Sequence, residues 1–410
     1  MNYCRLVPES SINHSETQLF RGQWGLSTDG NFLPDPWVVI IDGKTMEFGF
    51  GDPPSGIAEV NLPQGVILPG LVNAHTHLEL SVYKKPPEAN PINGVFNFAQ
   101  KMMMDNQKSA RHLSYEHDLE NKTGKKKLEA AIKEINKGTD EGTFYFVDIC
   151  NDPQFSQDIS GEFLGMRFLE ILGFSSKHDV QRIKTAAEAV KVDAGIIPAP
   201  HSVYGSSPNI FRFIYETNSN WASIHFLEDA DEKKLLQGLG AAKEFLTQIG
   251  QYQEYPEMPG GDIVEYLNST GFLKKKNILF VHALGVNEQD IQKIENSCEN
   301  PIWVICARSN AYLSYTRKNW EHLIKANGPI LLGTDSCATT DDLSIIREIQ
   351  YLISLDVQPA HKWFVAATFD AYKALGISIK DVPFYYFQGC TPDADSLSKQ
   401  KGVCLLDVKF

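Results

Sequence analysis

Closely spaced cysteines, long apolar runs and patches of one charge are all scarce in this 410-residue chain. The seven cysteines include no Cys-x-x-Cys pair and are scattered, at positions 4, 150, 298, 306, 337, 390 and 404. An odd number of isolated cysteines in a long chain argues against a disulfide framework and favours free thiols in a reducing compartment. We therefore expect a cytoplasmic protein.

Binding to membranes or nucleic acids is also disfavoured. The longest apolar runs, such as Trp37 to Ile41, have the length of a strand, whereas about 20 residues are needed to span a membrane. The N-terminus contains no apolar signal core. The net charge is −13, and the two basic runs, at 122–127 and 274–276, lie beside helical patterns. These features predict no membrane partner and no nucleic-acid partner.

The middle of the chain alternates between strand-length and helix-length segments. Strands that alternate with helices predict an α/β protein with a parallel sheet, and eight such units predict a (β/α)8 barrel of the TIM type. A doubly wound open sheet is the alternative fold. The expected strands are Val66–Leu68, Phe144–Ile149, Arg167–Leu172, Gly195–Ala199, Ala222–Ile224, Ile278–Val281, Trp303–Cys306 and Ile330–Leu332. The expected helices are Lys126–Lys137, His178–Lys191, Asn209–Thr217, Asp231–Gln248, Asp262–Ser269, Glu288–Cys298, Tyr315–Ala326, Asp342–Leu355 and Phe364–Gly376.

Both ends of the chain are rich in short strand candidates. Near the N-terminus, Asp42-Gly43 is a hairpin signal between the apolar run that ends at Ile41 and a second strand candidate, Met46–Phe50. Residues 402–410 have the same character. We expect the two ends to form a small β-sandwich domain (1–64 plus 385–410) beside the (β/α)8 domain (65–384).

His75 and His77 stand two residues apart after an apolar run, and Glu79 follows two residues later. Side chains on an extended strand repeat with a period of two, so both imidazoles point to the same side. Two such imidazoles supply half of a tetrahedral or five-coordinate metal site. Taken alone, the pair is equally compatible with two unrelated histidines near a turn.

Other histidines also stand at the ends of expected strands. In a (β/α)8 barrel, catalytic residues come from the carboxyl ends of the strands. Five of the eleven histidines and one aspartate occupy such positions, whereas the other six histidines lie in polar or helical contexts. Their convergence on one rim predicts a metal-dependent active site. These residues are His75, His77, His201, His225, His282 and Asp335.

The motifs, in this order, resemble the metal-dependent amidohydrolase superfamily over nearly the whole chain. The general motifs are Leu68-Pro-Gly-Leu-Val-Asn-Ala-His-Thr-His77, Val281-His-Ala283 and Leu332-Gly-Thr-Asp335. Three further elements are most similar to the deaminase branch, with its adenosine-type, aminodeoxyfutalosine, guanine and cytosine deaminases and triazine hydrolases. They are Ala199-Pro-His-Ser202, His225-x-x-Glu228 and Cys306-Ala-Arg-Ser-Asn310.

The resemblance implies that one divalent metal ion is bound by His75, His77, His225 and Asp335. Three imidazoles and a carboxylate suit Zn(II), and Fe(II) or Mn(II) fit similar ligands. No lysine takes the place of the carbamylated bridge of binuclear members, which favours a single ion. Such an ion lowers the pKa of a water and so supplies the nucleophile for hydrolysis.

The resemblance also implies catalytic roles for Glu228, His282 and Asp335. Asp335 would accept a proton from the water, and Glu228 would protonate a ring nitrogen of the substrate and pass a proton to the departing ammonia. His282 would orient or polarise the water, or else only position the metal ligands. For Glu228 the alternative is a solvated acid at the start of an acidic run.

Three residues are expected to bind the substrate. His201 has this role in the adenosine-type deaminases that the chain resembles, and the alternative is a structural histidine bonded within its loop. Glu79 would accept a hydrogen bond from an amino group or a ribose hydroxyl, or else be tied to backbone amides. Arg308 would pair with a substrate carboxylate, or else hold a loop through a salt bridge.

Three functions compete. The first is a metal-dependent hydrolytic deaminase that releases ammonia from an aminated purine nucleoside or related small heterocycle. The second uses the same site as a cyclic amidase or a triazine-type chloro- or amino-hydrolase. The third is a noncatalytic binding protein on this fold, which should have lost a ligand or the acid, whereas this sequence retains them all. Members that the chain resembles are often dimers, so a homodimer is also expected.

Overall fold

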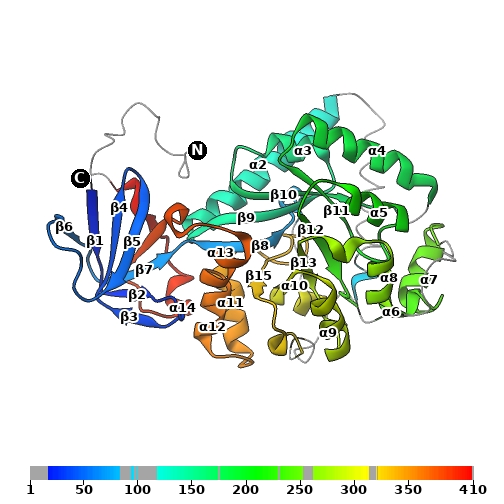
Figure 1. Cartoon of the computed structure of the whole chain (residues 1–410). Coiled ribbons are helices and arrows are strands. Elements are labelled where there is room, and N and C mark those ends of the chain that lie inside the picture. Colours follow the sequence, from blue (N-terminus) through cyan, green and yellow to red (C-terminus); the bar gives the residue numbers. More distant parts are fainter. Residues whose placement is uncertain are drawn as a thin grey trace.

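The computed structural model describes residues 17–83, 94–96, 98, 118–173, 176–229, 231–252, 262–313, 320 and 322–408. Eight parallel strands with helices around them form the larger part, and two mixed sheets form the smaller part (Figure 1). The first parallel sheet has the order β11-β10-β9-β8, and the second has the order β12-β13-β14-β15. Their bounds are β8 (Leu71–Thr76), β9 (Thr143–Cys150), β10 (Leu164–Ile171), β11 (Ile196–Pro200), β12 (Trp221–Phe226), β13 (Asn277–His282), β14 (Asn300–Ile305) and β15 (Ile330–Leu332).

Hydrogen bonds near the carboxyl ends of the strands join the two parallel sheets on both sides. On one side, the N–H of His225 in β12 donates to the carbonyl of His201, which follows β11, over 2.8 Å. On the other side, the N–H of Thr334, which follows β15, donates to the carbonyl of His75 in β8 over 2.9 Å. The arrangement is of the TIM-barrel type, although the ladders of the described residues do not form one closed eight-stranded sheet.

The prediction that Val66–Leu68 is the first barrel strand is wrong. This segment lies in β7 (Gly65–Pro69), which pairs with β16 (Phe384–Gln388) in the smaller part of the molecule. Strand β7 ends at Pro69, and Gly70 separates it from β8. A Cβ atom at Gly70 would lie 2.5 Å from the ring of Phe144, so only glycine fits there. The first barrel strand is therefore β8, and it is this strand that ends in the histidine pair.

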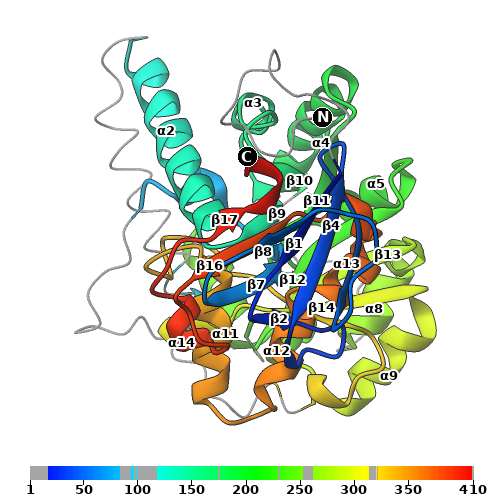
Figure 2. The ribbon, with the colours of Figure 1, turned by 90° about the vertical axis from the view of Figure 1, so that its left-hand side faces the viewer.

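The smaller part brings the two ends of the described chain together (Figure 2). Its sheets have the orders β5-β4-β1-β6 and β17-β16-β7-β2-β3. A shared core between the sheets includes Phe20 and Val38 from the first and Ile67 and Phe384 from the second, as expected for a β-sandwich. The bounds are β1 (Thr17–Arg21), β2 (Trp24–Leu26), β3 (Phe32–Pro34), β4 (Pro36–Ile41), β5 (Lys44–Phe50), β6 (Glu59–Asn61) and β17 (Val403–Cys404).

The hairpin between β4 and β5 turns at the predicted position. Asp42 and Gly43 both have a left-handed backbone, with φ of 50° and 69°, which is the conformation that a two-residue type I′ turn requires. The domain limits at residues 64/65 and 384/385 stay a prediction.

Most expected helices are present, and two are divided. The expected helix Asp231–Gln248 is split into α6 (Glu232–Leu235) and α7 (Gly240–Gln248), because Gly238 and Gly240 between them have φ of 68° and 86°. The expected helix Phe364–Gly376 is covered by α12 (Ala360–Ala366) and α13 (Phe369–Leu375), and Gly376 ends it in a left-handed conformation. The other helices are α2 (Asp118–Asp140), α3 (Pro153–Asp158), α4 (Ser176–Val192), α5 (Pro208–Glu216), α8 (Ile263–Ser269), α9 (Glu288–Ser297), α10 (Ala307–Tyr312), α11 (Ile345–Ser354) and α14 (Ala394–Leu397).

One expected helix, Tyr315–Ala326, lies half outside the described residues. Its described end is a short 3-10 turn, Leu323–Lys325. Among the described residues, six cysteines are buried, and none of these six forms a disulfide. No helix in the described part of the chain combines the length and apolar character that a membrane span needs.

Candidate active site

The structure gathers the strand-end histidines into one buried cluster. The Nε2 atoms of His77 and His225 lie 3.2 Å apart. The Oδ1 atom of Asp335 lies 3.6 Å from Nε2 of His77 and 3.9 Å from Nε2 of His75. Four side chains, from β8 and the residue after it, from β12 and from the loop after β15, therefore turn one ligand atom each toward a common point.

These four residues fit a metal ion. Both ring nitrogens of His75 are fully buried and have no hydrogen-bond partner, which is costly for a polar group unless another ligand is bound there. Ligands about 2.0–2.1 Å from a tetrahedral ion lie about 3.4 Å from one another, close to the separations seen here. Burial also lowers the pKa of His75 well below its ordinary value and lowers that of His77, so both are in the neutral form that binds metals.

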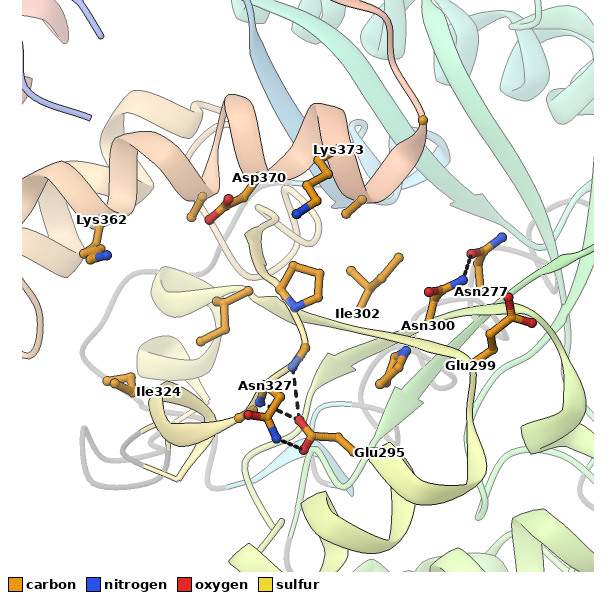
Figure 3. Close-up of a pocket in the computed structure, with 18 of the residues that line it drawn as sticks. Asn277, Glu295, Glu299, Asn300, Ile302, Ile324, Asn327, Lys362, Asp370 and Lys373 are labelled. Carbon is orange, nitrogen blue, oxygen red and sulfur yellow. Dashed lines mark hydrogen bonds between the residues drawn. The ribbon is translucent and has the colours of Figure 1, made fainter. Parts of the chain in front are cut away.

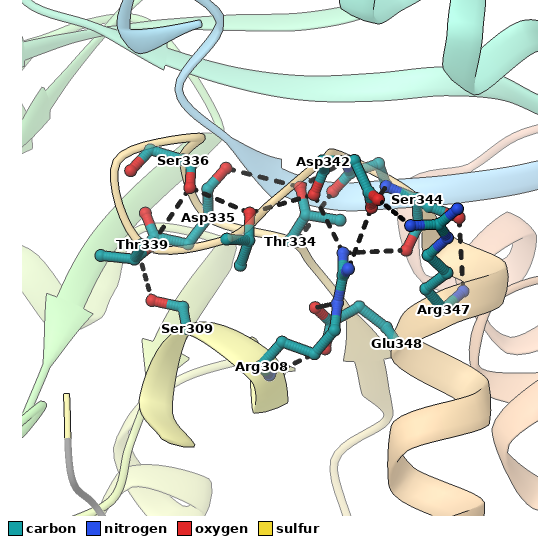
Figure 4. A network of polar contacts seen from close by, with 12 residues as sticks. Arg308, Ser309, Thr334, Asp335, Ser336, Thr339, Asp342, Ser344, Arg347 and Glu348 are labelled. Carbon is teal, nitrogen blue, oxygen red and sulfur yellow. Dashed lines mark hydrogen bonds and ion pairs between the residues drawn. The ribbon is translucent and has the colours of Figure 1, made fainter. Parts of the chain in front are cut away.

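Asp335 is fixed by its own loop and by α10. Its Oδ2 atom accepts hydrogen bonds from the hydroxyls of Ser309 (2.5 Å) and Thr339 (2.9 Å), which leaves Oδ1 to face the histidines (Figure 4). Its backbone is left-handed, with φ of 62°, and so is that of His282, with φ of 68°. Such strain in non-glycine residues costs about 1 kcal/mol or more and is concentrated at functional sites.

Glu228 and His282 stand beside this cluster, with Oε1 of Glu228 3.7 Å from Nε2 of His282. Burial raises the pKa of Glu228 to about 8, so near neutral pH it is a proton donor. Burial lowers the pKa of His282 to about 3, which keeps this imidazole neutral. The side-chain NH₂ group of Asn310 lies 3.0 Å from Nδ1 of His282 and donates a hydrogen bond to it. Nδ1 is therefore the acceptor nitrogen of the neutral ring, and the ring proton is on Nε2, which faces Glu228.

One pocket of about 270 Å³ is lined by His77, His225, Glu228, His282 and Asp335, whereas His75 lies behind its lining. The pocket has an apolar wall that includes Leu80, Phe98, Tyr204, Phe245 and Leu313. An apolar wall with a few convergent polar groups is typical of a site for a small ligand.

A larger cavity, of about 970 Å³, lies near the amino ends of β13 and β14 (Figure 3). Asn277 and Asn300, which begin these strands, line it, and Glu295 in its wall accepts hydrogen bonds from Asn327. Its lining contains no histidine and no cysteine. In a barrel of this type the amino ends of the strands serve stability, so the smaller pocket is the candidate active site.

His201 lines the pocket, as expected, and its ring stacks on that of His225 with the centroids 4.8 Å apart. Its Nδ1 atom lies 2.8 Å from the hydroxyl of Ser202 in the same loop. The expected substrate-binding position and the alternative loop bond are thus both present, one on each side of the ring.

Glu79 does not reach the pocket. The strand ends at Thr76 and residues Leu78–Leu80 form a 3-10 turn, so the period-two alternation that linked Glu79 to the histidine pair stops before it. Its carboxylate instead accepts hydrogen bonds from the backbone N–H groups of Asn151 (3.1 Å) and Asp152 (3.3 Å). The structure therefore favours the alternative of a carboxylate tied to backbone amides.

Arg308 also lies outside the lining of the pocket. Figure 4 shows it beside Asp342, Ser344 and Glu348. Its Nε donates to Glu348 over 2.7 Å, and its Nη1 donates to Asp342 over 2.9 Å. Nη2 donates to the carbonyls of Asp342 and Ser344. Because its donors are already used by buried acceptors, the structure favours the salt-bridge alternative over binding of a substrate carboxylate.

Replacing Arg308 with alanine is expected to lower the free energy of unfolding by about 3 kcal/mol, because the substitution leaves the buried carboxylates of Asp342 and Glu348 without their cationic partner. The Arg308 side chain is only 16% exposed, and that of Asp342 is 1% exposed. Arg347 pairs with the same Asp342 but is 43% exposed, so Arg347→Ala should cost less than about 1 kcal/mol. Urea denaturation of both variants measures the difference, and equal losses would contradict the assignment.

Three residues that sequence reasoning did not single out complete the site. Ser309 holds Asp335, Glu170 contacts His225 and lines the pocket, and Arg182 also lines the pocket. Within the described part of the chain, Arg182 forms no ion pair or hydrogen bond. Glu170 is the penultimate residue of β10, so its place at the carboxyl end of a barrel strand was a signal that could have identified it. Arg182 lies inside α4, and no local pattern distinguished it.

The sequence model of the Amidohydrolase family matches residues 66–380. This chain therefore belongs to the amidohydrolase family. The match spans the parallel strands β8 to β15 and all of the pocket residues named above.

Among proteins of known function, the 5-methylthioadenosine/S-adenosylhomocysteine deaminase of Pyrococcus abyssi is 24% identical over 366 residues, which cover 83% of this chain and 76% of that protein. The solved structure of the aminofutalosine deaminase of Helicobacter pylori superposes with a TM-score of 0.75 at 19% identity, covering 94% of this chain and 97% of the other. A zinc-bound adenosine deaminase from Xanthomonas campestris has a TM-score of 0.67 at 18% identity, with 95% and 90% coverage. The expected membership in the amidohydrolase superfamily is confirmed, and the similar proteins named here are deaminases.

Proposed function

We propose that this protein is a metal-dependent hydrolytic deaminase that releases ammonia from an aminated purine nucleoside or a related heterocycle. The observation that carries the proposal is the convergence of His75, His77, His225 and Asp335 on one point beside the buried acid Glu228. The family match and the deaminase relatives support the reaction type. The names of these relatives support an adenosine-derived or aminodeoxyfutalosine-like substrate.

The four ligands would hold one divalent ion, for which zinc is our first choice because of the donor set and of the zinc-bound neighbour. When bound, the ion lowers the pKa of a water molecule and makes it a nucleophile at neutral pH. Asp335 would accept a proton from the attacking water. His282 presents its Nε2–H toward the pocket and orients the water.

Glu228 carries the remaining proton transfers in this proposal. It would protonate a ring nitrogen of the heterocycle, which makes the ring carbon more electrophilic, and would then take the hydroxyl proton of the added water and deliver it to the departing amino group. The proton left on Asp335 would restore the acid form of Glu228. Burial suits it to the first step because the acid form persists at neutral pH. His201, at the pocket wall, contacts the bound heterocycle.

An ammonia-release screen tests this function. The purified protein, with and without a chelator, is incubated with adenosine, 5′-modified and carboxylated adenosine analogues, guanine, cytosine and a chlorotriazine. We expect release from at least one adenosine derivative, and loss of that activity after chelation. Hydrolysis of the chlorotriazine, measured as chloride release, without ammonia from any adenosine derivative would favour the second function, and absence of bound metal and of all activity would favour a noncatalytic binding protein.

Arg182, at the pocket, takes over the role first expected of Arg308. Replacing Arg182 with alanine should raise KM about tenfold or more for an adenosine derivative that carries a carboxylate, since a charge-assisted hydrogen bond contributes about 1.5–3 kcal/mol. In the same variant, KM for an adenosine derivative without the carboxylate should stay within about twofold of the parent value. Arg212, an exposed arginine on α5 outside the pocket lining, provides the control variant Arg212→Ala. Equal losses for charged and neutral substrates would contradict this role.

A further inference from the structure

We propose that Glu170 is a positioning residue that fixes the ring orientation and tautomer of the metal ligand His225. The inference rests on the proposed metal site and adds a role for a carboxylate at the end of β10. Glu170 is 6% exposed, and its Oε1 atom lies 3.2 Å from Nδ1 of His225. The other ring nitrogen, Nε2, is the one that lies 3.2 Å from Nε2 of His77.

The two nitrogens of His225 thus have different surroundings. To bind a metal through Nε2, the ring must carry its proton on Nδ1, and that proton needs an acceptor. Two acceptors lie 3.2 Å from Nδ1: the backbone carbonyl of His201, which is hydrogen-bonded to it, and Oε1 of Glu170, a buried atom that has no other partner among the described residues. A carboxylate behind a ligating imidazole fixes the ring and raises its basicity toward the metal.

Glu170 is itself held in place from the neighbouring strand. Its Oε2 atom accepts a hydrogen bond of 2.8 Å from the side-chain amide of Asn151, just beyond β9. The backbone N–H of Asn151 donates in turn to Glu79. A continuous chain of contacts therefore runs from Glu79 through Asn151 and Glu170 to His225, and it gives Glu79 a function outside the pocket.

A purely structural role for Glu170 is less consistent with its surroundings. Burial of a carboxylate is costly, and among the described residues no lysine or arginine forms an ion pair with Glu170. Its Oε1 instead lies 3.2 Å from the imidazole of a residue in the metal cluster. Because Glu170 also lines the pocket, direct contact with substrate is the competing role, and metal binding in the absence of substrate separates the two.

The test measures metal affinity rather than turnover. Zn(II) dissociation constants are obtained by competition with a chromophoric chelator, and the visible spectrum of the Co(II) form reports the ligand geometry. Glu170→Ala should raise the Zn(II) dissociation constant about 10- to 100-fold and change the Co(II) bands. Glu170→Gln, which keeps an acceptor oxygen, and Asn151→Ala should give smaller changes in the same direction, and they preserve the test if the alanine variant does not fold.

Asp179 provides a matched control. It is fully buried and accepts hydrogen bonds from Ser207 and Asn209, away from the histidines. Asp179→Asn should lower stability but leave the Zn(II) dissociation constant within about twofold of the parent. If folded Glu170 variants bind Zn(II) as tightly as the parent, the positioning role is overturned while the deaminase proposal stands. A parent protein that binds no divalent ion would overturn both.

Discussion

Replacing Glu228 with glutamine is expected to lower kcat by about 10²- to 10⁴-fold while the metal ion stays bound. The amide has nearly the shape of the carboxyl group, but it cannot donate an acidic proton to the ring nitrogen or transfer one to ammonia. Glu228 is not one of the four ligands, so the metal content measured by atomic absorption should remain that of the parent. Full activity in this variant would remove Glu228 from the proton transfers.

Glu232 provides the matched control for this experiment. It is a fully buried acid four residues further along the chain, it bonds to the backbone N–H of Asp229, and it does not line the pocket. Glu232→Gln should therefore leave kcat within a few-fold of the parent, even if the loop becomes less stable. A loss as large as that of Glu228→Gln would mean that both substitutions act by disturbing the loop.

The pH profile of the parent gives an independent measure of the same role. Burial raises the pKa of Glu228 to about 8, and the acid form is the one that donates the proton. kcat/KM should therefore be lost as the pH rises through that value, and this alkaline limb should be absent in the residual activity of Glu228→Gln. An alkaline limb that persists in the variant would assign it to another group.

Replacing Asp335 with asparagine is expected to reduce turnover by at least about 10³-fold and also to weaken metal binding. In the proposed mechanism Asp335, unlike Glu228, would have two roles: Oδ1, which faces the histidines, would bind the ion, and the carboxylate would accept the proton of the water. An amide has no negative charge to offer the ion and is a poor base. Turnover and chelator competition, measured on the same protein, should both reveal the loss.

An exposed aspartate on the same loop, Asp341, controls for a nonspecific effect of the substitution. Asp341→Asn should change neither turnover nor the metal dissociation constant by more than about twofold. Parent-like turnover in Asp335→Asn would place Asp335 outside the site. If Asp335→Asn keeps the metal but loses turnover, Asp335 would have only the role of proton acceptor.

The sequence determined the chemistry-bearing positions that depend on strand geometry. His75 and His77 share a side because strand residues alternate, and His225, His282 and Asp335 meet them because parallel strands end on one rim. The geometry in the structure agrees with this convergence, down to a separation of 3.2 Å between ring nitrogens 148 positions apart in the chain. The prediction of this cluster did not depend on the exact bounds of the strands, since it was correct although the first barrel strand was misplaced.

The tertiary structure alone decided which of the remaining charged side chains face the pocket. Glu79 points away from the pocket because a 3-10 turn replaces the strand after Thr76. Arg308 is hydrogen-bonded to Asp342 and Glu348, which are 34 and 40 positions away. Glu170 and Arg182 line the pocket instead. The direction of a strand side chain follows from its own backbone, whereas the partner of a long charged side chain depends on which distant groups are buried near it, and that is fixed only by packing.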